Sequence, residues 1–241
     1  MPHAPRSLVT AGNTREMIDR VRDWGNVFTG NTGYSIALAL ADVGPVELLT
    51  SNRAHAREIR AGLKTPHPVT VSTFTDHADL LHQLDQRMAA AHDYAAVFMT
   101  AAVADYKPVG AFAVTDRRAN PDGSETWTVR TAQAGKIRST HRQIAVLGEP
   151  TPKIVDLFRS RWTFRGLLVK FKLEVGVSPA ELITIGQQSR AASGADYLVA
   201  NTLDMVEGEK AGAYLLSDVG SEWVARAELP RRMAGLVTPK A

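Results

Sequence analysis

The sequence predicts an α/β protein with a three-layer, Rossmann-like wound sheet. Short apolar runs of strand length alternate with helical patterns along most of the chain, which is typical of strand–helix–strand units and a mainly parallel sheet. Small, flexible residues at 25–33 run directly into an apolar helix, and a second glycine turn at 10–16 follows the first apolar strand. Turns of this kind at the ends of strands are common in wound sheets that bind phosphorylated ligands.

Composition favours a single domain covering residues 1–241. A chain of 241 residues that is 44% hydrophobic can bury a substantial core. No linker, low-complexity run or repeat divides it. The net charge of +3 comes from scattered charges and gives no support for nucleic-acid binding.

The absence of cysteine excludes disulfides, thiolate catalysis and cysteine-ligated metal. The N-terminal segment lacks the apolar centre of a signal peptide, and no apolar run is long enough to span a bilayer. We therefore expect a cytoplasmic protein.

In the first half of the chain, apolar runs predict strands at residues 7–10, 45–50, 69–72 and 94–102. A helix is expected at 34–43, with Gly44 as its C-terminal cap. Asp76 can cap a second helix, which extends to about His92 because Leu80, Leu84 and Met88 keep helical spacing.

In the second half, alternating segments flank a Pro121-Asp122-Gly123 turn and predict a projecting β-hairpin arm at about 109–135. Winding resumes with a helix from Pro152 to Trp162. Ser178-Pro179-Ala180-Glu181 is a capping box with proline at the first helical position. The remaining strands are expected at 166–173, 195–201, 213–217 and 222–227.

Ligands of wound sheets bind outside the carboxyl ends of the strands, so residues directly after the predicted strands are candidates, at 12–16, 104–107, 171–174 and 201–202. Other candidates lie near the glycine segment and after the hairpin. Asn26 carries an amide that can both donate and accept, Arg22 offers a fork for phosphate, and Lys136 supplies a point charge. Asp105 could hold a magnesium ion on a polyphosphate or only cap a turn. Arg22 could equally pair with a neighbouring acid, and the seven histidines indicate no metal site.

Six segments in order resemble the family of phosphopantothenate-cysteine ligase, also called phosphopantothenoylcysteine synthetase. They are VTAGNTREMIDRVRDWGNVFTGNTG (9–33), MTAAVADYKP (99–108), GKIRST (135–140), TPKIVDLF (151–158), VKFKLE (169–174) and ADYLVAN (195–201). They cover nearly the whole chain and match the stand-alone type of the family, without the flavin-dependent decarboxylase half. The resemblance therefore implies that no FMN is bound.

The resemblance implies a carboxylate–amine ligase of coenzyme A biosynthesis. The carboxylate of 4′-phosphopantothenate would attack the α-phosphate of CTP or ATP, carried with Mg²⁺, to give an acyl-nucleotidylate and pyrophosphate. The amine of L-cysteine would then displace the nucleotide monophosphate. Charge neutralisation and positioning carry such chemistry. The resemblance also implies a homodimer, in which the hairpin at 109–135 would be the dimer arm or a flap.

Roles carried over by position make Asn26 and Lys136 catalytic: Asn26 would hold the carboxylate and the acyl intermediate, and Lys136 would stabilise the activated phosphate. The substrate would contact Arg22, Asn26, Thr29, Gly30, Ala101 and Ala102. The nucleotide would contact Gly12, Met99, Thr100, Ala101, Asp105, Lys136 and Phe171, with Asp105 on the magnesium side.

The chain departs from the family pattern at several positions. Asn31 and Thr32 replace a basic residue inside the glycine segment, and Thr151-Pro152-Lys153 replaces Asn-Pro-Asp. Ser189 and Ser193 stand where fused enzymes place lysines for the triphosphate, which leaves Arg190 as a possible substitute. The choice between CTP and ATP stays open.

Two other functions compete with the ligase. A glycine turn after the first strand and Arg53 after the second could indicate an NADP-dependent oxidoreductase, although the glycine fingerprint is incomplete. The substitutions at Ser189 and Ser193 could instead indicate a non-catalytic nucleotide-binding relative.

Overall fold

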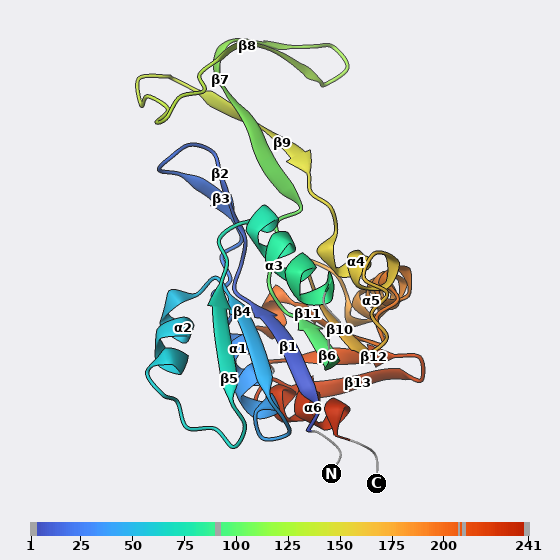
Figure 1. Cartoon of the computed structure of the whole chain (residues 1–241). Helices are drawn as coiled ribbons and strands as arrows, with labels where there is room; N and C mark the ends of the chain where they lie inside the picture. The colour runs from blue at the N-terminus through green and yellow to red at the C-terminus, as the bar shows by residue number, and fades with distance from the viewer. Residues whose placement is uncertain (1–3, 90–92, 207, 209–210, 239–241) are drawn as a thin grey trace.

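The protein consists of a wound α/β body from which a long β arm projects (Figure 1). The structure is a computed structural model that describes residues 4–89, 93–206, 208 and 211–238. The first and last described residues of the chain lie at the end of the body away from the arm (Figure 1). No helix among the described residues is long and apolar enough to cross a membrane.

An eight-stranded sheet with the order β13-β12-β11-β10-β6-β1-β4-β5 forms the middle layer. Its six strands from β11 to β5 pair in parallel, and β12 and β13 add an antiparallel edge. The strands are β1 (Arg6–Ala11), β4 (Val46–Thr50), β5 (Val69–Thr73), β6 (Tyr94–Met99), β10 (Leu167–Glu174), β11 (Tyr197–Thr202), β12 (Gly212–Ser217) and β13 (Gly220–Ala225).

Helices cover both faces of this sheet. The helices are α1 (Asn31–Leu40), α2 (Arg53–Arg60), α3 (His77–Ala89), α4 (Ile154–Ser160), α5 (Pro179–Ser193) and α6 (Leu229–Val237). Helices α1, α2 and α6 share one core cluster with the sheet, and α3 and α4 share another, while α5 packs on β11 and β12. The predicted three-layer α/β fold is therefore confirmed.

Burial on both faces explains why the strands are almost wholly apolar. In β1, Leu8 lies in the core under α3 and α4, whereas the next residue, Val9, lies under α1. Both side chains are fully buried. Successive side chains of a strand point to opposite faces, so a strand covered on both sides needs an apolar residue at nearly every position.

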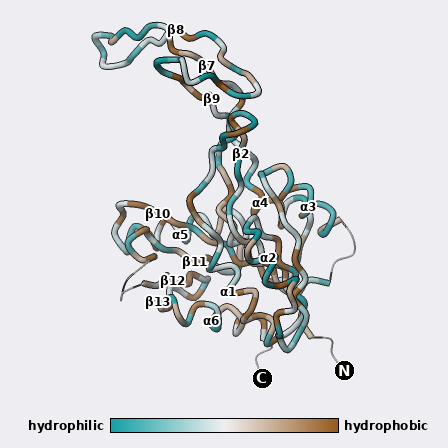
Figure 2. The backbone as a smooth tube through the Cα atoms, turned by 90° about the vertical axis from the view of Figure 1, so that its left-hand side faces the viewer, coloured by the Kyte–Doolittle hydropathy of each residue, from teal (hydrophilic) through white to brown (hydrophobic). Residues whose placement is uncertain are grey.

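The arm contains β7 (Tyr106–Ala119), β8 (Glu125–Thr131) and β9 (Ile144–Pro150), paired in the order β8-β7-β9. A short hairpin of β2 (Arg15–Met17) and β3 (Asp23–Gly25) lies beneath it (Figure 1). Figure 2 shows how far the arm projects from the body and that hydrophobic and hydrophilic segments mix along it.

Several element boundaries differ from the sequence prediction. Helix α1 begins at Asn31, three residues early, because Gly30 adopts a left-handed conformation that starts the helix directly after it, and it ends at the cap residue Ala41 rather than Gly44. Strand β6 ends at Met99, since its neighbours β1 and β10 provide no ladder beyond that point. Helix α4 is shorter than predicted. The end of α3 expected near His92 lies outside the described residues.

Candidate active site

A cavity of about 670 Å³ opens at the carboxyl ends of the parallel strands. From β1 the chain adds β4 and β5 on one side and later adds β6 and β10 on the other side. The order of strands therefore reverses between β1 and β6. Wound sheets bind ligands at this switch point. The cavity is lined by the ends of β6, β10 and β11, the start of α1 and residues near α6: Gly12, Val27, Phe28, Thr29, Gly30, Asn31, Thr32, Gly33, Thr100, Ala101, Ala102, Phe171, Lys172, Leu173, Val199, Asn201, Leu203, Met205, Val206, Gly212, Ala213, Arg226 and Leu229.

Two glycines bring the start of α1 against the end of β1. Gly12 and Gly30 have φ values of +87° and +81°, a region that side chains disfavour. A Cβ added to Gly30 would lie 2.1 Å from the backbone nitrogen of Gly12. The two glycine turns predicted from sequence therefore lie in direct contact, which is possible only without side chains.

The first turn of α1 has the electrostatics of an anion site. Its N-cap residue, Gly30, provides no side-chain cap, and the turn contains no acidic residue. The first N–H groups of a helix lack partners within the helix, and the helix dipole adds positive potential there. Because Asn31, Thr32 and Gly33 line the cavity, this turn can bind a phosphate or carboxylate group.

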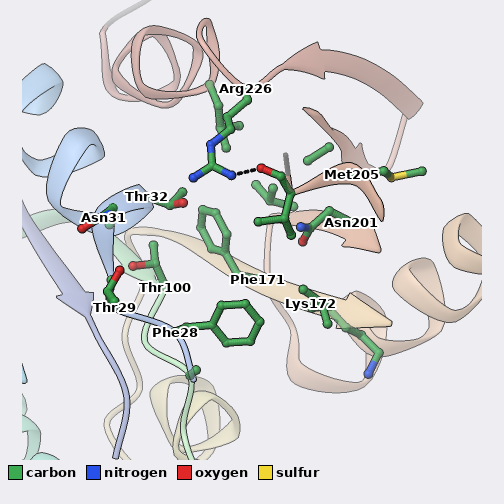
Figure 3. A pocket seen from close by; sticks show the side chains of 18 of the residues that line it. Phe28, Thr29, Asn31, Thr32, Thr100, Phe171, Lys172, Asn201, Met205 and Arg226 are labelled. Atoms are coloured by element: carbon green, nitrogen blue, oxygen red, sulfur yellow. Dashed lines mark hydrogen bonds between the residues drawn. The ribbon is translucent and has the colours of Figure 1, made fainter. Parts of the chain in front are cut away.

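The opposite wall is largely apolar. Figure 3 shows the rings of Phe28 and Phe171 near the centre of the cavity, with Asn201 to one side and Arg226 above. Arg226 donates a hydrogen bond to the carbonyl of Val206. A flat ring system could pack on this wall while a polar tail reaches α1.

The structure gathers seven of the predicted site residues around this cavity: Gly12, Thr29, Gly30, Thr100, Ala101, Ala102 and Phe171. Asn26 lies at its border, because the Asn26 side-chain amide donates to the Ala102 carbonyl at 3.2 Å. Met99 is buried at the end of β6, where its sulfur is 3.7 Å from the Thr10 hydroxyl. Their functional roles stay predictions.

Arg22 and Lys136 line a second hollow near the arm, with Val21, Ile137, Arg138, Ser139 and Thr140. The Arg22 guanidinium pairs with Asp19, with Nε 3.0 Å from Oδ2, and also donates to the Ile137 carbonyl at 2.7 Å. The alternative noted for Arg22, pairing with a neighbouring acid, is therefore present. Within one chain, the structure does not bring Lys136 to the main cavity.

Asp19 ties the segment between β8 and β9 of the arm to the β2–β3 hairpin. Its carboxylate accepts from the backbone N–H of Ile137 at 3.0 Å and from those of Val21 and Arg22 at 2.9 Å. These hydrogen bonds, led by that from Ile137, hold the pKa of Asp19 well below its usual range. No local pattern marks Asp19 as functional, because an aspartate in a charged turn is common.

Asp105 lines neither hollow and pairs with Lys153 at the surface. Among the described residues, no group of three or more His, Asp or Glu side chains could hold a metal ion. The possible magnesium role of Asp105 stays a prediction without a preformed protein site.

No role was predicted from sequence for the two lysines on β10, although Lys172 was placed at the ligand edge of the sheet. Lys172 lines the cavity, and the half-buried Lys170 amine donates to the Ser189 carbonyl of α5 at 3.0 Å. Burial lowers the pKa of Lys170. The signal available in the sequence was the alternation of Lys170 and Lys172 along a strand that ends at the ligand edge of the sheet.

Arg190 does not reach the cavity. Its guanidinium donates to Gln187 at 2.8 Å and to the Ala195 carbonyl at 3.2 Å, and it pairs with Asp218. The expectation that Arg190 could replace the late-helix lysines is therefore not supported, since its donors are already held by the body of the protein. Lys170 is the amine that approaches Ser189 instead.

Comparison with known proteins gives consistent matches. Residues 3–119 match the DNA/pantothenate metabolism flavoprotein C-terminal domain. The chain is 30% identical over 206 residues to the coenzyme A biosynthesis bifunctional protein CoaBC of Thermococcus kodakarensis, covering 85% of this chain and 43% of that protein. It is 33% identical over 137 residues to CoaBC of Mycolicibacterium smegmatis, covering 56% of this chain and 31% of that protein. The chain thus spans less than half the length of these relatives.

Solved structures agree with these matches. The DNA/pantothenate metabolism flavoprotein from Streptococcus pneumoniae superposes with a TM-score of 0.72 at 28% identity, covering 97% of this chain and 96% of that one. A Cab2 mutant in complex with phosphopantothenate-cysteine has a TM-score of 0.65 at 16% identity, covering 97% of this chain and 85% of that one, and shows the same fold. The chain is thus similar to the DNA/pantothenate metabolism flavoprotein C-terminal domain over residues 3–119 and to CoaBC over 206 residues.

Proposed function

We propose that the protein is a phosphopantothenate-cysteine ligase. It would join 4′-phosphopantothenate to L-cysteine in coenzyme A biosynthesis, using a nucleoside triphosphate, CTP or ATP, with Mg²⁺. The observation that carries this proposal is the cavity at the sheet switch point, where an anion-binding helix start faces an apolar wall. The match of residues 3–119 to the DNA/pantothenate metabolism flavoprotein C-terminal domain and the similarity to CoaBC support the same activity. We also propose that the protein is located in the cytoplasm.

In the first step, an oxygen of the substrate carboxylate attacks the α-phosphorus of the nucleotide, and the bond to pyrophosphate breaks. In the second step, the cysteine nitrogen attacks the acyl carbon, loses a proton and expels the nucleotide monophosphate. Asn26 borders the cavity through Ala102 and can donate to the acyl oxygen. Phe171 and Phe28 offer a surface for the base.

Lys136 and Arg22 lie together at the second hollow, and we propose that they act on the phosphate groups across a dimer formed through the arm. Asp105 would serve the magnesium side of the nucleotide. The proposed reaction uses no FMN. Arg53, which had suggested NADP, starts α2 and does not line the cavity, so nothing in the site favours the oxidoreductase.

The direct test incubates the protein with 4′-phosphopantothenate, L-cysteine, Mg²⁺ and either CTP or ATP. Pyrophosphate release and the mass of the product are measured. We expect release with one nucleotide, and an acyl-nucleotidylate without product when cysteine is omitted. No release with either nucleotide would reject the ligase, and nucleotide binding without release would favour the non-catalytic relative.

Two variants test the assigned roles. Lys136→Gln should lower the rate of pyrophosphate release at least about tenfold, because a charge-assisted contact to phosphate is lost. Asn26→Asp should slow transfer to cysteine, because a carboxylate cannot donate to the acyl oxygen. Lys64→Gln, on the exposed loop after α2, is the matched control and should be unaffected. Normal turnover of Lys136→Gln would contradict its role.

A further inference from the structure

His55 is a buried histidine that none of the proposed steps uses. It lies on α2 with 7% of its surface exposed. Its Nε2 is 3.0 Å from Oδ1 of Asn31, the first residue of α1. Asn31 itself lines the cavity. A titratable side chain is thus joined directly to the cavity wall at the anion-binding turn.

Two amide groups lie near Nε2 of His55: Oδ1 of Asn31 at 3.0 Å and Nδ2 of Asn52 at 3.3 Å. The shorter contact, to an oxygen that can only accept, assigns the proton to Nε2, which then donates to Asn31, while the Asn52 amide donates to the Thr29 carbonyl. Nδ1 is then the unprotonated nitrogen, and it is buried with no hydrogen-bond partner among the described residues. Protonation of Nδ1 would place an unsatisfied N–H in the interior, and burial lowers the pKa of His55, so the ring is neutral at neutral pH.

Neighbouring residues hold the ring in place. The ring of Tyr34, one helical turn after Asn31, stacks on His55 with centroids 4.3 Å apart and an angle of 8° between the planes. Asn52 caps α2 through the Ala54 N–H and donates to the Thr29 carbonyl at 3.0 Å. The turn at 29–31 and the start of α2 are therefore one connected unit. Glu58 is the charged group that acts on both Tyr34 and His55.

The contact with His55 also orients the nitrogen of the Asn31 amide. In Figure 3 the Asn31 oxygen points away from the cavity, toward the side on which its Oδ1 meets His55. With Oδ1 held there, the two N–H groups of Asn31 Nδ2 are left on the cavity side, next to the backbone N–H groups of the first turn of α1. All of these donors are neutral, and all suit an anion.

We propose that His55 is a positioning residue that orients the Asn31 amide, so that the start of α1 binds a phosphate group through neutral donors. This role rests on the proposed function only in taking phosphate as the anion. Without the His55 donor, the Asn31 amide can turn, and its oxygen would then face and repel the anion. His55 thus determines the sign of the local charge presented to the ligand.

The test measures binding of inorganic phosphate and of CTP by calorimetry in a set of variants. His55→Phe keeps the stack on Tyr34 and removes the donor, whereas His55→Gln can place an amide N–H near the position of Nε2. We expect His55→Phe and Asn31→Ala each to weaken binding about tenfold, the value of one hydrogen bond to a charged group. His55→Gln should stay within about twofold of the wild type.

The double variant His55→Phe, Asn31→Ala should bind no more weakly than Asn31→Ala alone, because His55 acts through Asn31. His82→Gln, an exposed histidine on α3 that contacts Gln86, is the control and should bind normally. Additive effects in the double variant, equal losses in His55→Phe and His55→Gln, or no binding of phosphate or CTP by the wild type would each overturn the proposal.

Histidine ¹⁵N NMR of the wild type gives a second readout that needs no variant to fold. We expect the Nε2–H tautomer for His55, and the Nδ1–H tautomer would refute the proposal. Pyrophosphate release is assayed on the same samples. Non-additive binding effects of the two substitutions without pyrophosphate release would reject the ligase and keep the role of His55. Pyrophosphate release with additive binding effects would reject only the role of His55.

Discussion

At the scale of single residues, glycines set the shape of the site. Gly30 starts α1 in a left-handed conformation and touches the backbone of Gly12, whereas a Cβ on Gly33 would lie 2.1 Å from the Thr100 hydroxyl. These close approaches bring the N-terminus of α1 to the ends of β1 and β6. The anion site therefore depends on the absence of side chains as much as on any functional group.

Gly30→Ala should lower the free energy of unfolding by about 2–4 kcal/mol, because both the left-handed φ and a backbone clash oppose the new Cβ. Urea denaturation measures this change. The matched control is Gly62→Ala, which has a φ of +92° but nothing within 4 Å of an added Cβ. It should cost only about 1 kcal/mol. Equal losses in the two variants would show that the contact with Gly12 is unimportant.

His55 predicts a dependence of stability on pH. Burial lowers its pKa in the folded protein below the value of about 6.5 expected in the unfolded chain. Below about pH 6.5 the unfolded chain therefore binds a proton that the folded protein does not, and stability falls as pH decreases until the folded pKa is passed.

Urea denaturation at about pH 7.5 and about pH 5 tests this prediction. The loss of stability between the two pH values should be smaller in His55→Phe than in the wild type. His82→Gln, at an exposed position, should keep the loss seen in the wild type. An unchanged loss in His55→Phe would contradict the assignment of a lowered pKa.

At the scale of elements, local signals and long-range contacts act differently. Helix α5 begins where its sequence predicts, since the Ser178 side chain bonds the Glu181 N–H and the Glu181 carboxylate bonds the Ser178 N–H at 2.8 Å. Gly194 ends the helix in a left-handed conformation. In contrast, β9 has no strong local signal and forms by pairing with β7, and the short strands β2 and β3 form by pairing with each other across the turn at 18–22.

Ser178→Ala should lower the free energy of unfolding by about 1 kcal/mol, because the first-turn N–H of Glu181 loses its cap. Thermal unfolding measures the effect. Thr184→Ala, at an exposed position in the same helix, serves as the control and should lose nothing, since alanine favours helix more than threonine. A similar loss in both variants would mean that the cap does not stabilise α5.

At the scale of the whole molecule, the arm is the part that does not pack on the central sheet. It projects away from the body (Figures 1 and 2) and carries exposed apolar side chains, among them Trp127, Ile144 and Leu147. Lys136 lies on the segment between β8 and β9, outside the main cavity. A homodimer formed through the arm, predicted from the resemblance, would cover these side chains.

Leu147→Glu should shift a dimer toward monomer, because a charge would be buried in the contact. Sedimentation velocity at several concentrations measures the shift. Val219→Glu, at the fully exposed turn between β12 and β13 and away from the arm, is the control and should leave association unchanged. A wild type that remains monomeric at all concentrations would contradict the predicted homodimer.

The sequence by itself determined the wound α/β fold, the capping box of α5 and the place of the glycine turns, because periodicity, caps and turns are properties of neighbouring residues. The resemblance also assigned Thr29, Gly30, Ala101 and Phe171 to one site, and all four line the cavity. Only the tertiary structure decided that Asp19 accepts from the Ile137 N–H, that Lys136 lies apart from the cavity and that His55 meets Asn31. Such contacts join residues distant in the chain, and a pairing of this kind leaves no local pattern, since its energy comes from burial and geometry that exist only once the layers have packed.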